Sequence, residues 1–139
     1  MYKKLLFIRI CFYFGFLADL IASIPLLFPS IGKKMFGLDS YIADDFFVYI
    51  TRIGASLMLG WTILLLWGSF KPIERKEILL FTVFPVLSGL LTASILVVNS
   101  GYIDISYVYP MWIFYSIVIP SYLFAYKLAW NINKVQDTI

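Results

Sequence analysis

Two opposite charges interrupt the apolar segments of this chain and are the first candidates for chemistry. Asp19 lies within the apolar run that begins near Leu5, and Arg52 lies within the run that begins near Phe46. A charged side chain inside a membrane span is costly, so it usually has a partner or a function. A carboxylate and a guanidinium can form an ion pair or bind a polar head group, and an unpaired carboxylate can carry a proton.

The elements that must position these charges are four apolar segments, at about residues 5–28, 46–68, 73–98 and 107–130. Each approaches or exceeds the roughly 20 residues that cross a bilayer as a helix. The composition is 62% hydrophobic and 14% charged, and the apolar runs do not alternate as strands of a membrane β-barrel do. We therefore predict one integral membrane domain over residues 1–139, an all-α, antiparallel four-helix transmembrane bundle.

The distribution of basic residues predicts the orientation of this bundle. If the helices alternate in direction, eight basic residues lie on the side of the termini, and only Lys33 and Lys34 lie on the other side. By the positive-inside rule, both termini are then cytoplasmic, in a multi-pass protein of the inner (plasma) membrane. The net charge of +3 thus reflects topology and contact with anionic lipid, not nucleic acid. The eight residues are Lys3, Lys4, Arg9, Lys71, Arg75, Lys76, Lys127 and Lys134.

The first outer loop, residues 30–45, is too apolar for a freely solvated connection because it contains residues such as Phe36 and Tyr41. We predict a short segment there that lies at the outer interface or folds over the mouth of the bundle. Asp44 or Asp45 is expected to cap the second helix by accepting hydrogen bonds from its first free N–H groups.

Depth and helical face suggest that the two intramembrane charges meet. Counted from the expected outer helix ends, Asp19 lies roughly 13 Å deep and Arg52 roughly 9 Å deep, a difference that an arginine side chain can span. Asp19 shares a face with Ser23, and Arg52 shares a face with Ser56 and Gly60. Faces rich in small residues usually point toward neighbouring helices. We predict an Asp19–Arg52 ion pair in the outer half of the bundle.

Other polar side chains could join this pair in a pocket that opens outward. The candidates are Ser23, Ser56, Thr92, Asn99, Tyr109, Tyr115 and Ser116. Three interpretations stay open. In the first, the ion pair fixes the helix register and the hydroxyl groups satisfy backbone carbonyls; in the second, the pocket is a ligand or proton site. In the third, the two charges never meet.

Metal and cofactor chemistry has little support in the composition. The chain contains one cysteine, Cys11, and no histidine. A single cysteine excludes an internal disulfide, and histidine is the commonest protein ligand of zinc and haem. We therefore predict no metal site and no cofactor.

The stretch from Arg52 to Gly60, Arg-Ile-Gly-Ala-Ser-Leu-Met-Leu-Gly, opens a span after an aromatic-rich approach. Together with Pro29 and the Phe36-Gly37 pair of the preceding loop, it resembles the DoxX-like superfamily of small four-helix bacterial membrane proteins. The resemblance implies an antiparallel four-helix bundle with Arg52 at a family-type position. Some of these relatives are associated with quinone-linked or thiol-linked redox systems, but this chain lacks the paired cysteines or histidines such a role would use.

Three functions follow from these patterns. The first is a non-catalytic membrane protein, either an accessory subunit of a larger complex or a bundle that binds lipid or a small, quinone-like ligand; its partner could be another membrane protein or a second copy. The second is a small proton-coupled transporter that uses Asp19, although an ion pair with Arg52 would hold the carboxylate ionised. The third is a lipid- or quinone-linked enzyme component, which ranks last because no nucleophile–base pair is recognisable.

Overall fold

The computed structural model describes residues 2–38 and 40–136, and its elements are all helical. Four helical segments are long and apolar enough to cross a membrane, which confirms the predicted fold class. Three of them are α1 (Tyr2–Leu27), α3 (Asp45–Phe70) and α6 (Ile105–Gln136), and α2 (Pro29–Met35) lies between the first two. The remaining span consists of α4 (Glu77–Phe81), the π-helical η1 (Thr82–Leu87) and α5 (Ser88–Asn99).

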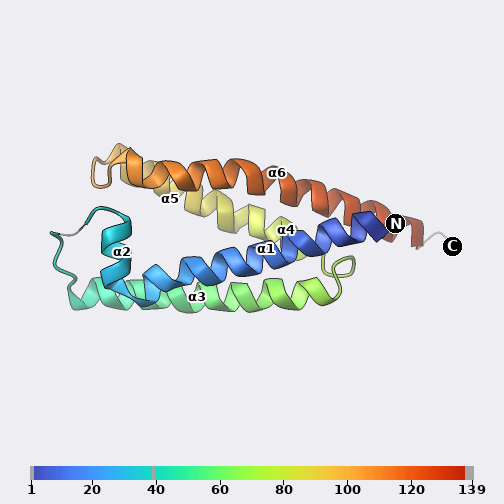
Figure 1. Cartoon of the computed structure of the whole chain (residues 1–139), viewed down its shortest axis with the longest axis horizontal. Coiled ribbons are helices and arrows are strands. Elements are labelled where there is room, and N and C mark those ends of the chain that lie inside the picture. The colour runs from blue at the N-terminus through green and yellow to red at the C-terminus, as the bar shows by residue number, and fades with distance from the viewer. Residues whose placement is uncertain (1, 39, 137–139) are drawn as a thin grey trace.

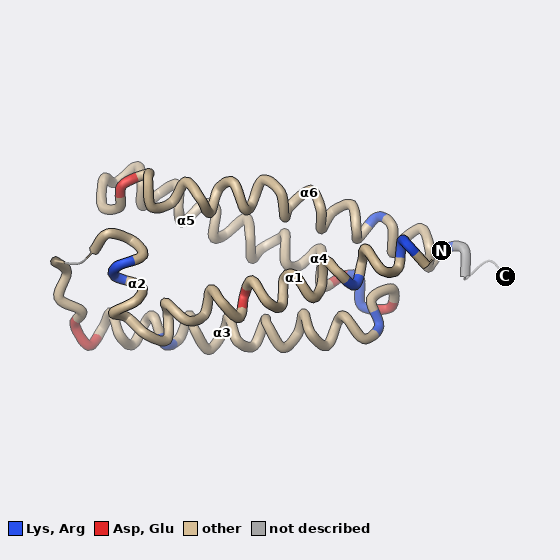
Figure 2. Tube along the Cα trace, viewed as in Figure 1, with Lys and Arg blue, Asp and Glu red and all other residues tan. Residues whose placement is uncertain are grey.

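The long helices run antiparallel in two pairs (Figure 1). Helices α1 and α3 lie side by side along their length, and α6 runs beside the α4–η1–α5 span. Both ends of the chain lie at one end of the bundle, named here the terminal end, and α2 lies across the opposite end, named the α2 end. Charged residues gather toward these two ends, while the stretch between them is mostly uncharged (Figure 2).

The hydrophobic core lies mainly in the half of the bundle nearer the terminal end. Its most buried side chains include Ile8, Phe12, Leu65, Leu79, Val83, Tyr122, Ala125 and Ala129. Toward the α2 end, the buried side chains are smaller, and include Ser23, Ala55, Ser94 and Val108. The two helix pairs also separate toward that end (Figure 1). The larger buried side chains thus lie nearer the terminal end, and the helix axes diverge toward the α2 end.

Glycines allow the closest approaches within the packed half. A Cβ atom added at Gly15 of α1 would clash with the Tyr122 side chain and would lie 3.3 Å from a methyl group of Leu65. Gly68 of α3 lies against the ring of Phe12 in the same way. Small residues at such positions let membrane helices pack closely, where dispersion contacts replace the hydrophobic effect.

Two tryptophans tie neighbouring helices through side-chain hydrogen bonds. Trp61 of α3 donates from Nε1 to Oγ1 of Thr82 in η1 at 3.2 Å, and Trp112 of α6 donates to Oγ of Ser94 in α5 at 2.8 Å. In lipid, a polar group without a partner costs more than in water, so these bonds help to select one packing of the helices.

Tyr122 provides the corresponding link between α6 and α1. Its hydroxyl donates to the backbone carbonyl of Cys11 at 3.1 Å, and its side chain is only 2% exposed. Tyr122→Phe is expected to lower the free energy of unfolding by about 1 kcal/mol, the usual contribution of one such hydrogen bond. Unfolding in mixed detergent micelles measures the change. Tyr109→Phe, at a side chain that is 57% exposed, is the matched control; equal effects of the two changes would contradict the assignment.

The helix boundaries follow capping chemistry. The backbone N–H of Phe47 donates to Asp44 Oδ1 at 2.7 Å, so Asp44 caps α3 as expected. At the start of α6, the N–H of Ser106 donates to Asp104 Oδ1 at 2.9 Å. Hydrogen bonds from Ser106 hold the pKa of the Asp104 carboxyl below its usual value. Helix α6 also runs on to residue 136, beyond the predicted end at 130.

The third span begins later than predicted. Residues 71–76 form turns, and the helix starts at Glu77 instead of residue 73. An ion pair between Lys71 and Glu74 at 2.9 Å and a backbone bond from Arg75 N–H to the Lys71 carbonyl at 3.0 Å hold this turn together. These local bonds hold residues 71–76 in turns, so the helix begins only at Glu77.

The predicted segment in the first outer loop is α2 and the residues after it. Gly32 of α2 lies against the carbonyl of Pro25, so α2 folds back directly on the end of α1. Gly37 has a positive φ of 67°, which favours glycine, and it lies against the ring of Tyr107 on α6. The segment 29–37 thus reaches from the end of α1 to the start of α6 at the α2 end of the bundle.

Candidate functional site

Asp19 lies on the face of α1 that packs against the rest of the bundle. Phe12, Gly15 and Ser23 precede or follow it by seven, four and four residues, and all three are buried. Residues at these spacings share one side of a helix. The Asp19 side chain itself is only half-buried.

Two tyrosines of α6 lie near the Asp19 carboxylate. Tyr115, which is 6% exposed, and Tyr122 lie within electrostatic range of this carboxylate. Within residues 2–38 and 40–136, however, Asp19 forms neither a hydrogen bond nor an ion pair. Asp19 is therefore an inward-facing carboxylate with aromatic neighbours and no protein partner in the described structure.

Arg52 lies on a different side of its helix. Its side chain is exposed, and Ser56, one turn further along α3, is exposed as well. Nothing lies within 4 Å of the position that a Cβ would take at Gly60. The face with Arg52, Ser56 and Gly60 therefore points away from the packed helices, not into the bundle.

The predicted Asp19–Arg52 ion pair is not formed in this structure. The ion pairs among the described residues are Lys71–Glu74 and Lys76–Glu77. Three contacts fix the register of α1 against α3: Gly15 with Leu65, Phe12 with Gly68, and Leu26 with Gly54. In this register Asp19 is level with Trp61, nine residues along α3 from Arg52, which corresponds to roughly 13 Å.

The difference has a simple structural cause. The predicted depths of Asp19 and Arg52 assume that the outer ends of their two helices are level. In the structure, α1 ends at Leu27 and the chain turns at once into α2. By the same register, Leu27 is level with Ile53, so α3 starts eight residues beyond the end of α1. Arg52 therefore lies near the end of α1 and not beside Asp19.

The seven candidate pocket residues do not converge on one space. Ser23 and Tyr115 are buried on the inward side of their helices, which is also the side of Asp19. The other five side chains are exposed: Ser56, Thr92, Asn99, Tyr109 and Ser116. The hydroxyls of Ser23, Ser56, Thr92 and Ser116 each donate to a carbonyl three or four residues earlier in their own helix. These four side chains thus satisfy backbone carbonyls of their own helices.

The pair of Trp112 and Ser94 was not predicted from the sequence. The two residues lie at nearly equal distances on either side of the turn near residue 103. Equal distance from a tight helix–helix turn is a signal that could have placed them opposite one another.

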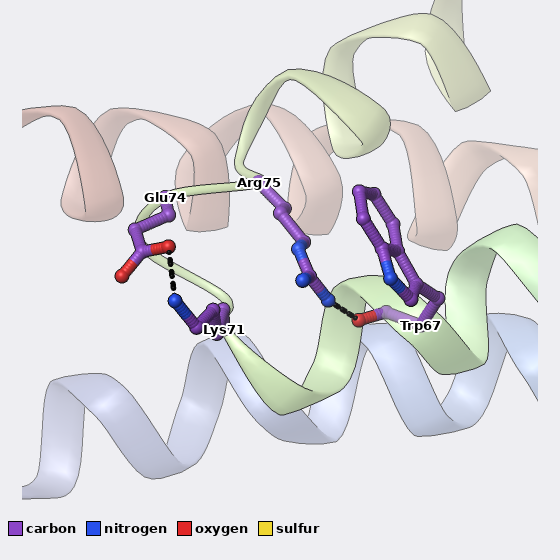
Figure 3. Close-up of polar contacts among 4 residues, drawn as sticks. All are labelled: Trp67, Lys71, Glu74 and Arg75. Carbon is purple, nitrogen blue, oxygen red and sulfur yellow. Dashed lines mark hydrogen bonds and ion pairs between the residues drawn. The ribbon is translucent and has the colours of Figure 1, made fainter.

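A second group of interactions organises the terminal end, where the turn between α3 and α4 carries several charges. The Arg75 guanidinium lies over the ring of Trp67, with Cζ 3.4 Å from the ring centroid, and donates to the Trp67 carbonyl (Figure 3). Lys76 is almost fully buried; its ammonium lies 3.1 Å from a Glu77 carboxylate oxygen and 5.4 Å from the centroid of the Trp130 ring. Basic and aromatic side chains thus pair where the helices leave the apolar stretch.

The fold and composition of the chain define its class, because the comparisons with known proteins found no match. No protein-family model matches the chain, and no curated protein or solved structure matches it. No group of three or more His, Cys, Asp and Glu side chains that could hold a metal ion occurs within the described residues. The four spans define a small integral membrane protein whose helices contact the lipid bilayer.

Proposed function

We propose that this protein is a non-catalytic membrane bundle that binds the cationic end of a small amphipathic ligand at Asp19. The observation that carries the proposal is the inward-facing carboxylate without a protein partner among the described residues. An acidic side chain inside a membrane span usually marks a functional site because it costs stability. The nearby Tyr115 and Tyr122 rings favour a cation, since aromatic faces attract positive charge.

The apolar surroundings select the rest of the ligand. Leu65, Val118 and Tyr122 belong to the core around this part of α1, so a ligand that reaches Asp19 must carry an apolar body on its charged group.

We further propose that both termini are cytoplasmic in the inner membrane and that the protein is a DoxX-like bundle serving as an accessory subunit. The orientation is supported by the eight basic residues expected at the terminal end, against Lys33 and Lys34 at the α2 end. The DoxX-like assignment is supported by the four-span architecture and the Arg52–Gly60 stretch.

A second candidate function, a proton-coupled transporter, is favoured by one observation. Among the described residues, no positive charge pairs with Asp19, and such a charge is what would favour a permanently ionised carboxylate. A carboxylate of this kind can exchange a proton for a cationic substrate. Accumulation of a cation in proteoliposomes only under an imposed pH gradient would identify the transporter; binding without accumulation would identify the binding bundle.

The binding proposal is tested with tetraphenylphosphonium, a cation with an apolar body, and the protein in lipid nanodiscs. Asp19→Asn keeps the shape of the side chain and removes its charge, so affinity measured by titration calorimetry should fall by about tenfold or more, as for loss of one close charge pair. Asp45→Asn, at an exposed carboxylate in the first turn of α3, is the matched control and should leave the affinity unchanged. Equal affinity of wild type and Asp19→Asn would overturn the proposal.

A further inference from the structure

A shallow, open hollow of about 350 Å³ lies on the outer surface of α6 near the terminal end, lined by Tyr126, Lys127 and Trp130. Ala125 and Ala129 of the same helix are fully buried and face the core. Residues 126, 127 and 130 lie on other sides of the helix, because successive residues turn by about 100°. The hollow therefore opens away from the core, toward the lipid that surrounds the bundle.

The position of the hollow along α6 corresponds to the membrane interface. Helix α6 has 32 residues, whereas about 20 residues cross the hydrocarbon core. Its last turns must therefore extend into the head-group region. Tyrosine and tryptophan concentrate at this level of a bilayer, and the rings of Tyr126 and Trp130 lie 6.2 Å apart here.

The electrostatics of the hollow favour an anion. The exposed Lys127 side chain has no hydrogen bond or ion pair with any residue that the structure describes. The Lys76 ammonium lies on the neighbouring Trp130 ring, but Glu77 already neutralises it. Lys127 thus contributes the available positive charge of the hollow, and the two aromatic rings form apolar walls beside it.

We propose that this hollow binds the head group of an anionic phospholipid from the adjacent leaflet. In this site the Lys127 ammonium donates hydrogen bonds to phosphate oxygens, while Tyr126 and Trp130 contact the glycerol and first acyl carbons. A lipid is favoured over a free anion because the hollow opens toward the bilayer and two of its three lining side chains are aromatic. The site is remote from Asp19 and does not depend on the function proposed there.

The test measures which lipids stay bound when the protein is purified from membranes that contain phosphatidylglycerol and phosphatidylcholine. Native mass spectrometry should find phosphatidylglycerol retained by wild type, and Lys127→Gln should reduce this retention about fivefold, as expected for one lysine at an anionic surface. Lys127→Arg should restore it. Lys34→Gln changes an exposed lysine at the α2 end and should retain the lipid as wild type does.

Each result decides the proposal. Equal retention by wild type and Lys127→Gln, or equal loss in the Lys34→Gln control, would overturn it. Displacement of the lipid by millimolar inorganic phosphate would also overturn it, because it would identify a site for free anions. Matching thermal unfolding of wild type and Lys127→Gln in pure phosphatidylcholine would show that reduced retention reflects the lost contact and not misfolding.

Discussion

Gly15→Val is expected to lower the free energy of unfolding by about 3 kcal/mol, near the upper end of the usual cost of overpacking. Any side chain at this position meets the Tyr122 ring and Leu65. Tyr122 cannot easily move aside, because its hydroxyl is bonded to the Cys11 carbonyl and its side chain is 2% exposed. The substitution therefore forces α1 away from α6 and breaks that hydrogen bond. Unfolding in mixed micelles, followed by circular dichroism, measures the change.

Gly60→Val is the matched control because it adds the same side chain to another membrane helix. Nothing lies within 4 Å of the position of its new Cβ, so its effect on the free energy of unfolding should stay within about 0.5 kcal/mol, as for most exposed substitutions. If the two substitutions destabilised the protein equally, the close contact between α1 and α6 would not exist in the folded bundle.

The fold class could be predicted because it depends on the length of apolar runs, which is a local property of the sequence. Each predicted span corresponds to a helical segment in the structure, and Asp44 caps α3 as its side-chain chemistry suggested. The start at Glu77 could not be read in this way. It depends on how Arg75 stacks on Trp67 and how Lys71 pairs with Glu74, and these interactions form only when the turn folds.

The candidate site could likewise be predicted only in part from the sequence. The inward direction of Asp19 was predictable, since Gly15 and Ser23 share its face and are both buried. The small residues beside Arg52 suggested the same for α3, yet Ser56 and Gly60 face outward. Small residues are common on all sides of membrane helices, so a stripe of them does not by itself identify the packed face.

The register between α1 and α3 could not be obtained from either helix alone. It is set by the fit of Gly15 against Leu65 and of Gly68 against Phe12, contacts between residues about fifty positions apart in the sequence. The early turn into α2 then shifts the end of α1 relative to α3. Two charges that seem level in the sequence are separated in the bundle for this reason.

Asp19→Leu is expected to raise the free energy of unfolding by about 2–3 kcal/mol, because a central aspartate costs about this much in a membrane helix. The gain requires that Asp19 has no partner, as observed among the described residues. If instead the carboxylate were half of a buried ion pair, its removal would destabilise the protein by about 3–5 kcal/mol. The two outcomes differ in sign, so thermal unfolding in bicelles separates them.

A double-mutant cycle with Arg52→Gln tests the same point without relying on the size of either single effect. Because the register places Asp19 roughly 13 Å from Arg52 along the helix axis, the effects of Asp19→Leu and Arg52→Gln should add to within about 0.5 kcal/mol. A coupling energy above about 1 kcal/mol would instead mean that the two charges pair in the bilayer. Additivity together with a more stable Asp19→Leu protein would leave a functional role, in ligand binding or in proton coupling, as the reason to keep a carboxylate that destabilises the bundle, since sites of function commonly carry such a cost.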